Sequence, residues 1–489
     1  MMIKFIKYFF IIFIPFMAIA NEVSINSISD AFANGKVDGL IRYGMQNRDS
    51  NYHITQDAPT DTSLNDIQAY SSLGGYIRYE TAPLYNISFG TTIYTSNPLG
   101  SNPSDEKGLG GLYEANGKQE SYSVIGEAFI KLKTDEHLVK IGKQELPNYR
   151  FVSLSDIRMT PLTYRGAIYE NSSINDLKLN LAYLTSQKGR NSTDFQDMVR
   201  AARISTGCGE LNSHGECVKS GEKRLLRGEY DPNHYNSSGN YIGEDKDMPL
   251  IGAIYTKSNF KIEAWNYYVN DFINTIYFYG DYTFNIIDNW KLLASGQYAH
   301  QDSIGDSVGG DVDTGFYGLK LQANLEDKIS LFTAYNKVDY NENSFDGGSI
   351  FVRWGTPQLF NSFQVQDGNL AGTKSIGAGV QFDLGALDII DSTVIRFRHA
   401  FYNMPDDLYK IDARQDRTES TFDVRYSFTK KYGFGIFTQL DGLSLQFRMA
   451  YNEFETDYNI EKYKLLHGYN AFSVTDNFLD MRVTIDYRF

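Results

Sequence analysis

Arginine at alternate positions gives this sequence its clearest binding chemistry. Arg396 and Arg398 stand two residues apart, and Arg448 and Arg482 hold comparable positions in later segments. Alternate side chains of an extended strand point to opposite faces, so these arginines share a face with polar neighbours while apolar residues occupy the other. A guanidinium binds a carboxylate through two parallel hydrogen bonds. A row of such groups on one wet face would attract small carboxylates.

Parity assigns several more arginines to the same polar face. The full predicted basic strip is Arg42, Arg78, Arg396, Arg398, Arg425, Arg448 and Arg482. Acids lie in the same segments, at Asp423, Asp480 and Asp486. The alternative is therefore that each arginine is paired with an acid and only stiffens the wall.

The two cysteines, Cys208 and Cys217, lie in a glycine-containing stretch of the longest polar segment, 186–248. An exported chain with two cysteines favours a disulfide. A metal site that adds His214 is the alternative, but it lacks a clear fourth ligand. We therefore expect a disulfide between Cys208 and Cys217 and no metal.

Catalytic motifs are absent from the sequence. There is no nucleophile elbow, no phosphate-binding glycine loop and no pair of metal ligands at helical spacing. We expect neither an enzyme nor a cofactor. A serine–histidine site near the rim of a barrel remains the enzymatic alternative, because the loops hold many polar residues.

The last eleven residues, 479–489, show which elements would position the arginines. Leu, Met, Val, Ile, Tyr and Phe fall on one parity, and Asp, Arg and Thr fall on the other. One wall of this strand is apolar and the other is charged. A final strand that ends on Phe489 resembles the closing strand of bacterial outer-membrane barrels, in which the terminal aromatic is part of the signal read by the barrel assembly machinery. A soluble edge strand is the alternative.

Segments with the same period of two recur along the whole chain, and we count eighteen. They are 37–46, 74–82, 85–95, 122–132, 137–143, 166–172, 177–185, 249–257, 259–269, 275–285, 290–299, 313–323, 329–337, 375–384, 392–401, 419–428, 442–451 and 479–489. Long loops, such as 47–73 and 96–121, alternate with short turns. This is typical of an all-β transmembrane antiparallel barrel with external loops and periplasmic turns. A soluble repeat protein such as a propeller is disfavoured by the lack of a fixed period.

The beginning of the chain predicts export. Residues 1–20 combine two lysines, an apolar run and the small-x-small site Ala18-Ile19-Ala20, as in a cleaved signal peptide. An uncleaved anchor is the alternative. We expect residues 21–36 to form a short periplasmic segment with a helix at 27–32, and residues 37–489 to form the barrel.

Residues 126–185 resemble the OprD family of outer-membrane porins. Lys140-Ile141-Gly142-Lys143-Gln144-Glu145-Leu146-Pro147 is similar to the strand that leads into that family's constriction loop. Ser155-Asp156-Ile157-Arg158-Met159-Thr160-Pro161-Leu162-Thr163-Tyr164-Arg165-Gly166 is similar to the loop itself. Weaker likeness covers Leu40–Tyr43, Arg48-Asp49, Gly75–Tyr79 and Phe89-Gly90. The stretch Asn148-Tyr149-Arg150 departs from the family pattern, so the tip of the loop is expected to differ.

The resemblance implies that loop 144–165 folds into the barrel and narrows the pore. Its charged members are Arg150, Asp156, Arg158 and Arg165, and for Asp156 and Arg158 we favour a role in holding the loop to the wall. A charge on the lipid face at mid-membrane costs about 2–4 kcal/mol, so the arginines of the strip must face the lumen. The strip resembles the basic ladder with which the family guides carboxylates.

The sequence thus predicts a porin of a Gram-negative outer membrane for passive diffusion of small, carboxylate-bearing nutrients. The alternatives are a general, weakly selective porin and a surface adhesin anchored by its barrel. Expected partners are small solutes, membrane lipid and lipopolysaccharide, to which acids in the external loops could bind through divalent ions. No nucleic acid is expected for a chain with net charge −14. Monomer and trimer both remain open, with the resemblance favouring a monomer.

Overall fold

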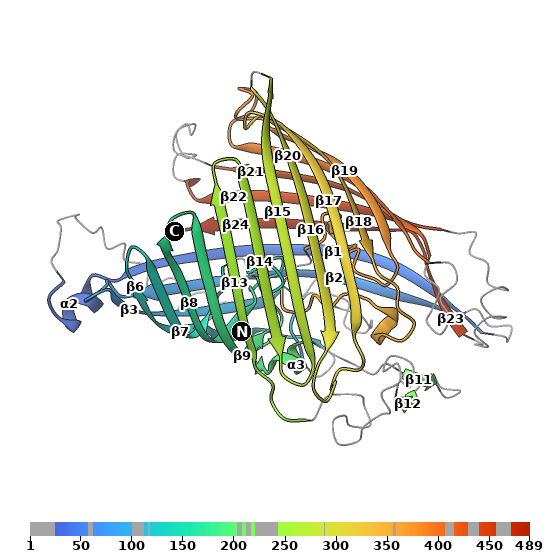
Figure 1. Ribbon diagram of the computed structural model, residues 1–489, viewed down its shortest axis with the longest axis horizontal. Helices are drawn as coiled ribbons and strands as arrows, with labels where there is room; N and C mark the ends of the chain where they lie inside the picture. The colour runs from blue at the N-terminus through green and yellow to red at the C-terminus, as the bar shows by residue number, and fades with distance from the viewer. Residues whose placement is uncertain are drawn as a thin grey trace.

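The computed structural model describes residues 25–56, 62–99, 112–115, 118–147, 149–153, 155–202, 208–211, 217–220, 243–287, 289–355, 358–405, 415–428, 440–455 and 471–489. The signal peptide expected at 1–20 lies outside these residues. Almost all regular structure within them is β-strand (Figure 1). Of the helices that the described residues form, none is long and apolar enough to cross a membrane.

The elements follow the chain in a simple order. The described residues form three short helices, α2 (Ile28–Ala33), α3 (Met198–Ala201) and η1 (Phe345–Gly347). The strands of the first half are β1 (Lys36–Gln56), β2 (Thr62–Glu80), β3 (Ile87–Pro98), β4 (Glu114–Ala115), β5 (Lys118–Gln119), β6 (Tyr122–Lys133), β7 (His137–Gln144), β8 (Thr163–Ile174), β9 (Leu177–Lys188), β10 (Phe195–Gln196), β11 (Cys208–Leu211) and β12 (Cys217–Ser220). Those of the second half are β13 (Met248–Lys257), β14 (Phe260–Val269), β15 (Ile273–Ile287), β16 (Trp290–Ser303), β17 (Asp313–Leu325), β18 (Ile329–Val338), β19 (Lys374–Asp383), β20 (Thr393–Asn403), β21 (Arg417–Ser427), β22 (Leu443–Phe454), β23 (Ala471–Thr475) and β24 (Phe478–Arg488).

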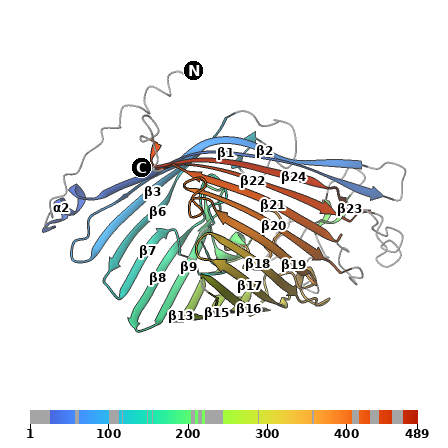
Figure 2. The ribbon, with the colours of Figure 1, turned by 90° about the horizontal axis from the view of Figure 1, so that it is seen from above.

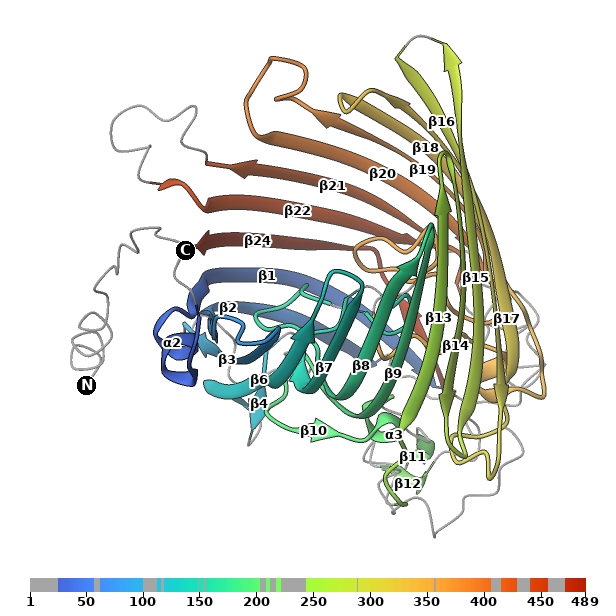
Figure 3. The ribbon, with the colours of Figure 1, turned by 60° about the vertical axis from the view of Figure 1, so that its left-hand side comes forward.

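The main sheet is an antiparallel barrel that closes on itself. It has 20 strands, of which β10 is a two-residue addition beside β9 and β23 continues the line of β24 along β1, which leaves the predicted eighteen in the wall. Each of the eighteen predicted segments coincides with one of these strands. The last strand pairs with the first from Leu40 opposite Arg488 to Arg48 opposite Asp480, and Figure 3 shows them side by side. Closure leaves no unpaired edge along this seam.

Alternation of side chains gives the barrel two different faces. Along β3, Ile87, Phe89 and Ile93 are exposed outward, while Thr92 and Tyr94 are fully buried on the inner side. The outer face is thus apolar, and the inner face carries the polar groups that the sequence pattern assigned to it. Figure 2, the view from above, shows how the strongly tilted strands β1, β2, β22 and β24 run together across one side of the wall.

The first hairpin is longer than the sequence predicted. We expected a loop at 47–73, but β1 has 21 residues and β2 has 19, and they stay in register as far as Ile54 opposite Thr62. A membrane-spanning strand needs about 9–11 residues. The extra length carries polar residues at both parities, and a strand in water needs no apolar face, so the alternation that marks the other strands is lost.

The short helix before the barrel was predicted correctly. Ser27 caps α2 by accepting a hydrogen bond from the backbone N–H of Asp30 at 3.0 Å, and Asn34 ends the helix. The helix is tied to the barrel because Ala82 N–H donates to Ala31 O at 2.9 Å.

Several loops fold inward and build an apolar core inside the barrel. The sequence predicted one such loop at 144–165, and in the structure it spans 145–162 between β7 and β8. The structure adds residues 189–202, which include α3, and the loop 339–373 between β18 and β19. Their buried apolar side chains form one cluster with those of the wall: the loop members are Leu146, Tyr149, Phe151, Val152, Leu162, Met198, Val199, Ile350, Phe351, Val352, Trp354 and Leu359.

Hydrogen bonds of Trp354 and Gln358 join the three inward segments to one another and to β8. The Trp354 indole Nε1 donates to Met198 O at 2.9 Å, and the Tyr164 hydroxyl donates to Trp354 O. Gln358 Nε2 donates to Arg150 O at 2.9 Å. The loops therefore support one another as a packed unit, and the lumen is filled on the side of β8–β18.

Candidate functional site: an arginine pocket beside the inward loops

The register of the late strands places charged residues in one row across the lumen wall. Arg396 on β20 stands opposite Asp423 on β21, and Asp423 stands opposite Arg448 on β22. Arg448 in turn faces Arg482 on β24, which faces Gln46 on β1. Neighbouring strands lie about 4.8 Å apart, so these side chains form a continuous polar band.

A polar pocket of about 200 Å³ lies between this wall and the constriction loop. Five arginines line it, with two aspartates among the other residues: Arg42, Arg158, Arg425, Arg448, Arg488, Asp156 and Asp486. The pocket brings together one end of the predicted strip and the tip of the loop. A cavity with this lining can bind a small anion.

Arg42 ties the constriction loop to the wall. Its Nε and Nη2 donate to the two carboxylate oxygens of Asp486, both at 2.7 Å. Nη1 donates to Asp156 Oδ1 at 2.7 Å and to Arg158 O at 2.8 Å. The donors of this guanidinium are therefore engaged by the protein, and the Asp156 ion pair fixes the loop tip.

Arg425 and Arg448 differ from Arg42 in having no such partners. Neither forms a hydrogen bond or an ion pair with any side chain or backbone group in the described part of the chain, and Arg425 is exposed to the lumen. Each guanidinium therefore has donors available to a solute. Arg158 also lines the pocket, and its Nη1 donates to Gln46 Oε1.

The remaining late arginines make contacts of intermediate kind. Arg482 Nε donates to Asp480 Oδ1 at 2.6 Å, and Asp480 also receives Arg48 Nε at 2.7 Å. Arg396 Nη2 donates to the neutral Gln381 Oε1 at 2.6 Å. Arg398 donates to Thr421 Oγ1 at 3.2 Å, and its Cζ lies 4.5 Å from the ring centre of Phe363 in loop 339–373.

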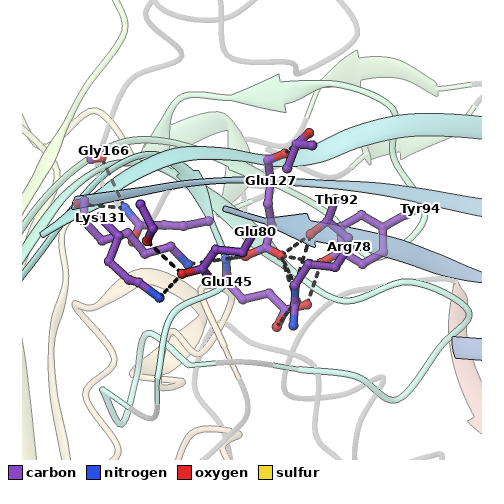
Figure 4. Close-up of polar contacts among 12 residues, drawn as sticks. Arg78, Glu80, Thr92, Tyr94, Glu127, Lys131, Glu145 and Gly166 are labelled. Carbon is purple, nitrogen blue, oxygen red and sulfur yellow. Dashed lines mark hydrogen bonds and ion pairs between the residues drawn. The ribbon is translucent and has the colours of Figure 1, made fainter. Parts of the chain in front are cut away.

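Arg78 belongs to a separate cluster and does not line the pocket. Figure 4 shows it with the acids that bind it. Arg78 Nη2 lies 2.7 Å from Glu127 Oε2 and 3.2 Å from Glu145 Oε2. Glu127 is 1% exposed and also receives Lys140 Nζ at 3.4 Å and Thr92 Oγ1 at 2.6 Å. Sequence parity put Arg78 on the lumen side but could not reveal that two carboxylates contact it, the buried Glu127 and the half-buried Glu145.

Glu145 stands in this cluster directly after β7. Burial raises the pKa of its carboxyl, and the nearby charge of Glu127 raises that pKa further. The Tyr94 hydroxyl donates to Glu145 Oε1 at 2.5 Å and favours the charged form. The start of the constriction loop therefore holds a titratable group.

Arg150 lies in the constriction loop as predicted, whereas Arg165 lies outside it. Arg150 binds Glu263 of β14 with Nε to Oε2 at 2.7 Å and Nη2 to Oε1 at 2.5 Å, so it anchors the other side of the loop. Arg165 was expected in the loop, but β8 already begins at Thr163. Tyr164 is fully buried and faces inward, so strand alternation turns Arg165 outward, where it lies 5.4 Å from the Phe195 ring centre.

The cysteine backbones lie on two short paired strands. In the hairpin of β11 and β12, Cys208 stands opposite Ser220 and Leu211 stands opposite Cys217. The side chains lie outside the described part of the structure, so the disulfide remains a prediction.

One group of metal-ligand types is found in the described residues. His300 Nε2 lies 2.9 Å from Asp302 Oδ1 and 3.8 Å from Asp313 Oδ1. Both aspartates are exposed. The group is not part of the arginine pocket, and only its proximity points to an ion.

Sequence reasoning missed the contribution of loop 339–373 to the lumen. Gln364 Nε2 donates to Asp480 Oδ1 at 2.7 Å, and Arg482 Nη2 donates to Gln364 O at 3.2 Å. This part of the loop has no alternating pattern, and its contacts join residues more than a hundred positions apart. A run of Phe351, Trp354 and Phe360 between two strands was the available signal, since external loops seldom need such apolar residues.

Solved structures of other proteins share this architecture. Pseudomonas aeruginosa OccK9 (OpdG) superposes with a TM-score of 0.66 at 18% identity, over 94% of this chain and 99% of that one. Acinetobacter baumannii OccAB3 superposes with a TM-score of 0.67 at 16% sequence identity. Pseudomonas aeruginosa OpdK, in a structure with vanillate, superposes with a TM-score of 0.64 at 16% identity. Each match covers 94% of this chain and 99% of the other chain. At these identities the likeness concerns the fold.

Comparison of sequences identifies the family. No curated protein matches the sequence. The sequence model of the outer membrane porins of the OprD family matches residues 99–470, which is well over half of the chain. The eighteen-strand barrel, its apolar outer face and this match agree: the chain is an integral outer-membrane protein and belongs to the OprD family of porins.

Proposed function

We propose that this porin conducts small hydrophilic solutes that carry a carboxylate, and that the arginine pocket selects them. The observation that carries the proposal is the state of Arg425 and Arg448. Both line the pocket, and neither hydrogen-bonds to another described residue. An arginine whose donors are unused can bind a carboxylate without first breaking a contact within the protein.

The positions of the arginines suit the movement of a solute along the pore better than tight binding at one site. Arg396 and Arg398 lie on β20, Arg425 on β21 and Arg448 on β22. A solute carboxylate can move from one guanidinium to the next, and conduction requires that each site bind weakly enough to release its ion. The constriction loop, held by Arg42 and Arg150, sets the width of the path.

The roles of the seven predicted arginines then divide. Arg425 and Arg448 make the first contacts with a solute, and Arg396, Arg398 and Arg482 extend the positive field along the wall. Arg42 holds the loop, and Arg78 neutralises Glu127 and Glu145. The relative OpdK has a structure with vanillate, an aromatic carboxylate, which agrees in chemical class.

The test is the reversal potential of single channels in a planar bilayer under a salt gradient. We expect the parent to favour anions, and Arg425→Gln/Arg448→Gln to shift the reversal potential toward cations and to weaken block by benzoate. The control is Arg165→Gln, which removes one positive charge from the outward face of β8, as each member of the double variant does from the inner face. If the double variant and the control behave alike, the pocket does not select anions, and a general porin is the better description.

A further inference from the structure

Loop 339–373 meets the lumen wall through a single buried carboxylate. Glu419 on β21 points inward and is fully buried. Its Oε1 accepts hydrogen bonds from the backbone N–H groups of Gln364 at 3.1 Å and Val365 at 2.8 Å. Its Oε2 accepts the N–H of Gln366 at 2.9 Å. Three consecutive residues of the loop thus converge on one side chain.

In the described part of the chain, no cation contacts this carboxylate directly. Its hydrogen bonds there come from the loop backbone. Burial of a carboxylate is costly unless hydrogen bonds replace its water. The loop backbone therefore stabilises the buried Glu419 carboxylate, and the carboxylate in turn holds the loop against the wall.

The two halves of the loop are held by different forces. Ile350, Phe351, Val352, Trp354 and Leu359 are buried in the apolar cluster of the inward loops. The turn closed by Phe363 N–H to Gln366 O at 3.0 Å is held mainly by polar contacts. Apart from the bonds to Glu419, its side chains reach Asp480 and Asn452 of the wall at 2.7 and 2.9 Å. The first half is a fixed base. The second half lies outside the cluster of the inward loops, and its apolar contact with the wall is the packing of Phe363 and Leu370 against Ala400, Tyr402 and Met404.

The turn lies against the positive wall. Arg482 Nη2 donates to Gln364 O at 3.2 Å, and the Arg398 guanidinium lies 4.5 Å from the ring centre of Phe363. The position of the turn therefore decides how much of Arg398 and Arg482 faces the pore.

We propose that Glu419 is a positioning residue for a second constriction, the turn at 361–367, which limits access to Arg398 and Arg482. The turn is docked while Glu419 holds its three amides, and the pore widens when it leaves. The proposed role of Glu419 concerns the width of the pore and does not depend on selectivity for carboxylates.

The experiment compares Glu419→Gln with Asp423→Asn. Both remove one negative charge from the inner face of β21, but within the described residues Asp423 accepts hydrogen bonds only from the side chain of Gln446. Glutamine keeps the size of the side chain. Its NH₂ group is a donor, however, and cannot accept the backbone N–H groups that bind the carboxylate. We expect Glu419→Gln to raise the main single-channel conductance and to add transitions between levels, while Asp423→Asn keeps the parent's single level. Equal conductance in the two variants would overturn the proposal.

A second measurement reports the turn directly. Ser362→Cys, placed in a Cys208→Ser/Cys217→Ser background, is treated in proteoliposomes with a membrane-impermeant maleimide. We expect Glu419→Gln to raise its labelling rate by roughly tenfold, equivalent to about 1.4 kcal/mol in the docking equilibrium. An unchanged rate would also overturn the proposal. The reversal potential tests the arginine pocket separately, so the two proposals can fail independently.

Discussion

Arg448 and Arg482 stand directly opposite each other on β22 and β24, two cations in one cross-strand pair. Arg482 is compensated, because its Nε lies 2.6 Å from Asp480 Oδ1. Arg448 makes no hydrogen bond within the described part of the chain. Like charges in direct cross-strand positions destabilise a sheet. Arg482 therefore supports the barrel through Asp480. Arg448 adds a repulsion that destabilises the sheet, which fits a role in binding solutes.

Neutralising these two arginines should affect stability in different ways. Arg448→Gln relieves repulsion and is expected to leave the free energy of unfolding unchanged or to raise it by up to about 1 kcal/mol. Arg482→Gln leaves the fully buried Asp480 short of a donor and should cost about 1–3 kcal/mol. Unfolding by guanidinium in lipid vesicles, followed by tryptophan fluorescence, measures both. Similar losses in the two variants would contradict this division.

Replacement of Arg42 by lysine should loosen the constriction loop. The guanidinium bridges Asp486 and Asp156, and a lysine ammonium cannot reproduce both bidentate contacts. We expect Arg42→Lys to lower stability by about 1.5–3 kcal/mol and to increase current noise at fixed voltage. Arg488→Lys is the control, since Arg488 lines the same pocket but makes one long contact, 3.4 Å to the Tyr76 hydroxyl. Equal noise in both variants would argue against a clamp.

Acidification should make the channel more selective for anions through Glu145. Burial and the charge of Glu127 raise its pKa above the ordinary glutamate value of about 4.3. As the pH falls into the window above that value, Glu145 takes up a proton while it would still be charged in an unfolded chain. Folding is then favoured more strongly as the pH falls, and one negative charge disappears beside Arg78. Reversal potentials recorded as the pH is lowered toward that value should move toward anion selectivity, and Glu145→Gln should flatten this dependence.

A methyl group at Gly142 should disturb the foot of the constriction loop. Gly142 has φ of 128°, and a Cβ there would lie 2.2 Å from Ala128 O. We expect Gly142→Ala to lower the free energy of unfolding by about 1–3 kcal/mol, the cost of holding a residue in a disfavoured backbone region. Gly296→Ala is the matched control in β16, because its Cβ would meet nothing nearer than Leu319 Cδ2 at 3.8 Å. Urea midpoints of the two variants should separate clearly; coincident midpoints would mean that the strand adjusts.

The sequence predicted most of the barrel because hydrocarbon imposes a period of two on every strand that crosses it. The same reasoning failed for β1 beyond Asn47, where strand continues without an apolar face. It also failed for the partners of the charged residues. Arg78 and Arg482 both satisfy the parity rule, but only the fold brings Glu127 and Glu145 to the first and Gln364 to the second. Such contacts depend on closure of the sheet and leave no local pattern.

The apolar cluster around Trp354 has a consequence for biogenesis. Its members come from segments near residues 150, 198 and 352, which meet only inside the curved wall between β7 and β19. This small core cannot form before the wall bends, because its members lie far apart in the sequence. Loop packing is therefore expected to be a late event in maturation. Substitutions at Trp354 should accumulate unassembled precursor in the periplasm, even though the side chain is distant from the pairing edges.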